Sequence, residues 1–141
     1  MLKRAEIEAR IPHAGSMCLL DRVSAWNATR IVCHAAAPTA DHPFAKPQGV
    51  PAVAAIEYAA QAAALHGALL DDRQAPRNGM LAKLAGVELV AGRLDEAAGE
   101  LTVQADLVVQ GASGCMYSFM VQHDRVCRAR GRLLVVFTHD D

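Results

Sequence analysis

The most informative stretch of this chain is DHPFAKPQGVPAVAAIEYAAQAAALHGALL, residues 41–70. From Val53 to Leu70 it contains no proline and one glycine, and alanine, the best helix former, dominates it. The residues before Val53 are rich in the proline and glycine of irregular loops, and Pro51 suits the first turn of a helix, where its missing amide costs nothing. The stretch therefore predicts a loop that leads into a long helix.

The predicted helix is long and apolar enough to be compared with a membrane span, which needs about 20 residues. Glu57, Gln61 and His66 argue against a span, because an ionisable side chain is costly in the middle of a bilayer. A thin, alanine-rich helix suits close packing against a sheet instead. We therefore expect a buried helix in a soluble domain, with no membrane span.

Strand patterns follow the helix. Alternating apolar residues predict strands at 100–110 and 115–123, and the turn sequence GASG at 111–114 predicts an antiparallel hairpin between them. Further strands are expected at 29–37, 82–90 and 126–137. The residues expected on the buried faces of the hairpin are Leu101, Val103, Ala105, Leu107, Val109, Cys115, Tyr117, Phe119 and Val121. The pattern predicts a single α+β domain, residues 1–141, in which a curved antiparallel sheet packs on one helix.

Composition excludes several classes of protein. The chain has 141 residues, enough for one substantial core, with 52% apolar residues and 21% charged residues. A net charge of -1 offers no basic surface for nucleic acid. The N-terminal residues have no apolar run like that of a secretory signal or an anchor, so a cytoplasmic protein is expected. The dispersed Cys18, Cys33, Cys115 and Cys127 suggest reduced core thiols rather than zinc ligands or disulfides.

A carboxylate and an imidazole near the start of the helix suggest acid/base chemistry. Glu57 lies on a helix that must bury one face, and Gln61 follows at i+4, where it could orient the carboxylate. His66, nine residues beyond Glu57, falls on nearly the opposite side. His42 lies in the preceding loop. Free amides at a helix N-terminus can stabilise a developing oxyanion, so this junction suits proton abstraction next to a carbonyl.

Two segments carry a family resemblance. IPHAGSMCLLDRV, residues 11–23, and HPFAKPQGVPAVAAIEYAAQAA, residues 42–63, resemble the signatures of the hotdog-fold 3-hydroxyacyl-acyl carrier protein dehydratases. The residues of these segments are most similar to those of the dehydratase-like subunits of bacterial aryl-polyene and related polyketide clusters. The resemblance implies a hotdog fold, with a curved antiparallel sheet wrapped around one central helix.

The resemblance also implies roles for individual residues. His42 would be the general base at the alpha carbon, and Glu57 would protonate the departing beta hydroxyl. The two groups come from different subunits in the family, so a homodimer, or a heterodimer with another hotdog subunit, would be the active unit. The substrate would arrive on the phosphopantetheine arm of acyl carrier protein, with no metal, nucleotide or redox cofactor. The candidate substrate-binding residues are His13, Pro51, Ala52 and Gln61.

The sequence departs from the family pattern in ways that leave alternatives open. Phenylalanine and proline are reversed in His42-Pro43-Phe44, and the gap to Glu57 is one residue longer. Ala52 replaces the glycine expected where a backbone amide would polarise the thioester carbonyl. One alternative is therefore a non-catalytic hotdog partner subunit of a heteromeric dehydratase. A second is a hotdog acyl thioesterase in which Glu57 activates water.

The remaining polar residues are expected to be structural. His34 lies in a strand pattern with no acid nearby in the sequence. The arginines of the last strand suggest a solvated face, with docking of an acidic carrier protein as the other possibility. Ser16, Ser113 and Cys115 lack the surroundings of an activated nucleophile. The arginines concerned are Arg125, Arg128, Arg130 and Arg132.

Overall fold

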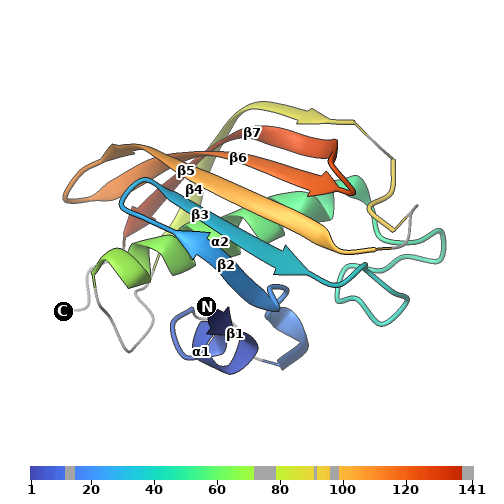
Figure 1. Ribbon diagram of the computed structural model, residues 1–141. Coiled ribbons are helices and arrows are strands. Elements are labelled where there is room, and N and C mark those ends of the chain that lie inside the picture. Colours follow the sequence, from blue (N-terminus) through green and yellow to red (C-terminus); the bar gives the residue numbers. More distant parts are fainter. Residues whose placement is uncertain (12–14, 72–78, 91, 96–98, 138–141) are drawn as a thin grey trace.

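The long helix α2, Ala55–Leu70, lies across one face of a curved antiparallel sheet (Figure 1). The computed structural model describes the chain except for residues 12–14, 72–78, 91, 96–98 and 138–141. The sheet has seven strands in the order β1-β2-β3-β5-β6-β7-β4. They are β1 (Leu2–Lys3), β2 (Arg22–Trp26), β3 (Arg30–Ala35), β4 (Gly79–Leu89), β5 (Leu101–Gln110), β6 (Gly114–His123) and β7 (Val126–Phe137). This is the predicted α+β architecture.

The helix begins as the sequence predicts, after Pro51. A short 3-10 helix, η2 (Ala52–Ala54), precedes α2, and the Ala54 amide donates to the carbonyl of Pro51 at 3.0 Å. Small side chains along one face let the helix lie close to the strands, and α2 contacts β3, β5, β6 and β7. Its fully buried alanines are Ala55, Ala59 and Ala62. The predicted close packing of an alanine-rich helix on a sheet is confirmed.

The strand predictions hold with one error on the hairpin. Strands β3 to β7 form at the expected segments, and β5 pairs with β6 across the predicted turn. Val109, expected on the buried face, is exposed because the register shifts between Leu107 and Val109 and turns the end of β5 over. Every other residue predicted on that face is buried except Leu107, which is partly buried.

Elements at the N-terminal end of the chain were not predicted. They are β1, β2, the helix α1 (Arg4–Glu8) and the 3-10 helix η1 (Gly15–Met17). All four cysteines are free, and Cys127 is only half-buried. Residues 52–70 are apolar and long enough for a span, but most of that segment is buried in the core, so no membrane protein is indicated.

Candidate functional site

A pocket of about 330 Å³ opens beside the start of α2. Most of the side chains that line it are apolar, and Glu57 and Lys46 bring the charged groups. Glu57 lies in the first turn of α2 and is half-buried. The lining residues are Phe44, Lys46, Pro51, Val53, Ala54, Ile56 and Glu57. An apolar pocket with a carboxylate in its wall can hold an acyl group and present it with a proton donor or acceptor.

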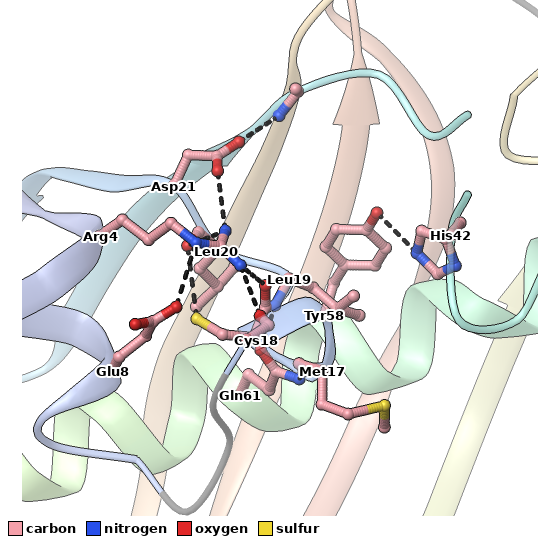
Figure 2. A network of polar contacts seen from close by, with 12 residues as sticks. Arg4, Glu8, Met17, Cys18, Leu19, Leu20, Asp21, His42, Tyr58 and Gln61 are labelled. Carbon is pink, nitrogen blue, oxygen red and sulfur yellow. Dashed lines mark hydrogen bonds and ion pairs between the residues drawn. The ribbon is translucent and has the colours of Figure 1, made fainter. Parts of the chain in front are cut away.

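Gln61 holds the carboxylate of Glu57 in place. Its Nε2 donates to Glu57 Oε1 at 3.1 Å, which confirms the contact predicted from the i+4 spacing. The same Nε2 donates to the carbonyl of Met17 at 2.8 Å, and Oε1 accepts from the amide of Leu19 at 2.9 Å (Figure 2). A flipped amide would place oxygen against two acceptors, so these three bonds fix its orientation. Gln61 is almost fully buried.

His42 makes two hydrogen bonds within its own chain. Its Nδ1 accepts from the amide of Phe44 at 3.0 Å, and its Nε2 lies 3.0 Å from the hydroxyl of Tyr58 (Figure 2). Because a backbone amide can only donate, a neutral ring carries its proton on Nε2 and donates it to Tyr58. Burial lowers the pKa of His42, and Asp95 opposes that shift. The ring is therefore held as a neutral donor.

The side chains of His42 and Glu57 have different hydrogen-bond partners in the structure. His42 is absent from the lining of the pocket that contains Glu57. Its partner Tyr58 follows Glu57 in the helix, about 100° further around the axis. Within this chain the ring of His42 thus bonds to Tyr58, whereas Glu57 bonds to Gln61 and lines the pocket.

The amides at the start of the helix differ from the sequence-based expectation. The amide of Ala52 donates to the carbonyl of Gly92 at 3.1 Å, and Ala52 is buried outside the pocket lining. The next amide, that of Val53, makes no hydrogen bond within the described residues. Pro51 and Val53 both line the pocket. Among the described residues, the amide of Val53 rather than that of Ala52 is the one without a hydrogen-bond acceptor, so it is the candidate donor for a carbonyl oxygen.

Of the three other candidate histidines, the structure describes His34 and His66. His13 lies outside the described residues. His66 is fully buried, with Nδ1 2.6 Å from the hydroxyl of Tyr117 and Nε2 2.8 Å from the carbonyl of Asn27, so it is not a partner of Glu57, as predicted. His34 does have an acid nearby, because its Nδ1 lies 3.4 Å from Glu100 Oε1. The sequence analysis did not find this neighbour, because Glu100 is 66 positions away and immediately precedes β5, the strand that pairs with β3.

Sequence reasoning also missed Tyr58, and it missed the contacts of Gln61 with Met17 and Leu19. Tyr58 follows Glu57 in the helix, but nothing in the local pattern indicates that its hydroxyl meets the loop histidine. Within the described part of the chain, no group of three or more His, Cys, Asp or Glu residues could hold a metal ion.

Comparison with known proteins places the chain in a family. The model of the ApeP-like family, described as ApeP dehydratase, matches residues 5–141. The chain belongs to the ApeP-like dehydratase family. No protein with a curated description matches the sequence.

Solved structures agree on the hotdog fold. The dehydratase heterocomplex ApeI:P from Xenorhabdus doucetiae is similar with a TM-score of 0.84 and 20% identity, over 96% of this chain and 92% of that one. A mutant of the thioesterase SAV0944 from Staphylococcus aureus subsp. aureus Mu50 has a TM-score of 0.64 and 15% identity, over 83% of this ApeP-like chain and 92% of the other. Both have the sheet and central helix of the hotdog fold.

Proposed function

We propose that this ApeP-like chain is a subunit of a cytoplasmic dehydratase that converts 3-hydroxyacyl thioesters on acyl carrier protein into trans-2-enoyl thioesters. The reaction would serve fatty acid or polyene biosynthesis, including aryl-polyene and polyketide pathways. The observation that carries the proposal is Glu57, which lies in the wall of an apolar pocket with its carboxylate held by Gln61. Membership of a dehydratase family supports the choice of reaction.

The proposed reaction needs a base and an acid. His42, once its ring is released from the hydrogen bond to Phe44 or to Tyr58, removes the proton from the alpha carbon, the electron pair forms the double bond, and the bond between the beta carbon and its oxygen breaks. Glu57, in its protonated form, gives its proton to the departing hydroxyl, which leaves as water. An apolar pocket wall favours the acyl chain and keeps bulk water away from these steps. No metal or redox group has a role in this scheme.

A two-chain site fits the positions of these groups. His42 and Glu57 have different partners within one chain, so we propose that His42 of one subunit meets Glu57 of another. Strand β4 offers a surface for such pairing, because it is an edge strand that carries the exposed apolar residues Leu81, Leu84 and Leu89. The opposite edge, β1, has two residues and leads directly into α1. The ApeI:P structure is itself a heterocomplex.

Two observations favour a second candidate, a non-catalytic hotdog partner subunit. Both ring nitrogens of His42 are engaged in the chain, so the ring has no free lone pair with which to accept a proton. The amide of Ala52, at the position expected to polarise a thioester carbonyl, donates to Gly92 instead. In this second reading the chain supports a partner that supplies the base.

The candidates are separated by intact-protein mass spectrometry of a 3-hydroxyacyl-acyl carrier protein. The chain is tested alone and mixed with a second hotdog dehydratase chain. If His42 is the base, loss of one water disappears in His42→Ala. Water loss that persists in His42→Ala, but only when the second chain is present, supports the partner subunit. Release of free carrier thiol from a saturated acyl thioester would instead indicate a thioesterase.

A further inference from the structure

The segment at residues 15–21 lies between the N-terminal helix and α2, and two of its amides make hydrogen bonds to backbone carbonyls among the described residues. The amide of Cys18 donates to Gly15, and the amide of Asp21 donates to His34. Cys18, Leu19 and Leu20 are buried in the core, and further hydrogen bonds to the segment come from side chains outside it. Those outside hydrogen bonds therefore help to position the Met17 carbonyl and the Leu19 amide, which bind Gln61.

Arg4, the first residue of α1, supplies most of these contacts (Figure 2). Its Nη2 donates to the carbonyls of Gly15 and Cys18, at 2.8 Å and 2.5 Å. Its Nη1 donates to Asp21 Oδ1 at 3.0 Å and to the carbonyl of Leu20 at 3.4 Å. Its Nε lies 3.2 Å from Glu8 Oε1. One guanidinium thus fixes four positions of a segment seven residues long.

The contacts of Arg4 and Gln61 interleave along the segment. Arg4 binds at residues 15, 18, 20 and 21, and Gln61 binds at residues 17 and 19. A shift of the segment therefore moves the groups that orient the amide of Gln61. Because the same Nε2 donates to Glu57, the shift also changes the hydrogen bond that holds the carboxylate.

We propose that Arg4 is a positioning residue for Glu57, acting through residues 15–21 and the amide of Gln61. The inference rests on the proposed function in giving Glu57 a part in the reaction. The planar guanidinium suits this place because it presents five donors in a fixed fork, whereas a lysine ammonium would reach one or two of the same acceptors. Asp21 also accepts from the amide of Ala36 at 2.7 Å, and its own amide donates to the carbonyl of His34, so this end of the segment stays attached without Arg4.

Kinetics with a 3-hydroxyacyl-acyl carrier protein test the proposal in the active assembly. Arg4→Ala is expected to lower kcat about tenfold with little change in KM, because it misplaces a reacting group without altering the pocket. Arg4→Lys should recover part of that loss. Arg10→Ala is the matched control, because Arg10 Nη1 donates to the carbonyl of Glu6 in the same N-terminal region, and its kcat should equal that of the wild type.

A double-mutant cycle tests the route. In a Gln61→Ala background, Arg4→Ala should cause no further loss of kcat, because the connection to Glu57 is already broken. Losses that multiply independently would overturn the proposal, as would full activity in Arg4→Ala. Thermal unfolding of each variant separates loss of fold from loss of position, and Arg4→Lys takes the place of Arg4→Ala in the cycle if the latter does not fold.

Side-chain NMR of Gln61 tests the inference without activity. In the wild type both Nε2 protons are bonded, so they should exchange slowly with water; Arg4→Ala should speed that exchange at least fivefold and Arg10→Ala should leave it unchanged. Unchanged exchange in Arg4→Ala would contradict the inference. If the wild-type assembly removes no water from any substrate, the proposed function fails. The exchange measurement then decides by itself whether Arg4 positions the amide of Gln61.

Discussion

Individual side chains around the first turns of α2 determine what the pocket can do. Glu57 and Tyr58 are consecutive, yet they face different surroundings: Glu57 meets Gln61 and the pocket, and Tyr58 meets the loop histidine. Burial raises the pKa of Tyr58 well above its ordinary value, so its hydroxyl stays protonated and its oxygen remains an acceptor for His42. The two residues of the proposed acid/base pair, Glu57 and His42, are therefore positioned by different neighbours.

The tautomer of His42 is a testable consequence. Long-range ¹⁵N NMR at a pH where the ring is neutral should show the proton on Nε2, because the amide of Phe44 occupies Nδ1. Tyr58→Phe should lower the free energy of unfolding by about 1 kcal/mol, since Nε2–H loses its acceptor. A ring with its proton mainly on Nδ1 would contradict the hydrogen bonds described here.

The packing of α2 depends on small side chains. Ala62 is fully buried in the core, whereas Ala60 is only partly buried. Ala62→Leu should lower the free energy of unfolding by about 1–3 kcal/mol, because extra carbons at a fully buried position force neighbouring side chains to shift. Ala60→Leu, the matched control, should change it by less than half as much. Urea denaturation of both variants provides the comparison, and equal losses would show that the helix does not pack as described.

Helix and strand periodicity made most of the fold predictable from the sequence. Residues 53–70 and the later strands have strong local patterns. Strand β2 was missed because Val23 is its one buried residue, so no apolar alternation marks it. Val109 was placed on the wrong face because a register shift depends on the pairing with β6.

The candidate site was predictable only in its local part. The contact between Glu57 and Gln61 follows from helix geometry. The bonds of Gln61 to Met17 and Leu19 join residues 44 and 42 positions apart, and no local pattern contains them. The hydrogen bond between His42 and Tyr58 depends on how the loop folds back onto the helix. The amide of Ala52 is not available to a substrate because it donates to the carbonyl of Gly92. These features come from tertiary structure.

Stability of the folded protein should depend on pH through its buried histidines. Burial lowers the pKa of the fully buried His66, although the carbonyl of Asn27 and the charge of Asp106 oppose the shift. Below the ordinary histidine pKa of about 6.5, the unfolded chain takes up a proton that the folded chain resists. The free energy of unfolding should therefore decrease as pH falls from that value through the lowered pKa of His66.

Urea unfolding of wild type and His66→Gln across pH 5 to 8 checks this dependence. Glutamine does not titrate, so the variant should show a flatter profile on the acid side even if it is less stable throughout. Parallel profiles would show that His66 is not the group responsible. His34 and His42 also have pKa values lowered by burial, so some dependence should remain in the variant.

Assembly should involve the exposed edge of the sheet. Leu84 on β4 is 39% exposed, and β4 has a neighbouring strand on one side among the described strands. A lysine at this position should oppose pairing with a second chain, because its charge would have to be buried in the interface. Light scattering after size exclusion should show a smaller species for Leu84→Lys. Lys3→Ala on β1, at the opposite edge, should assemble like the wild type.

In the proposed reaction Glu57 protonates the departing hydroxyl of a 3-hydroxyacyl thioester. Glutamine at this position keeps a side-chain oxygen to accept from Gln61 but cannot supply the acidic proton. Intact-protein mass spectrometry of 3-hydroxyacyl-acyl carrier protein is the direct measurement, with wild type and Glu57→Gln assembled with the same partner chain. Water loss at least about 100-fold slower in Glu57→Gln is the predicted result. Equal water loss by the two proteins would contradict the account.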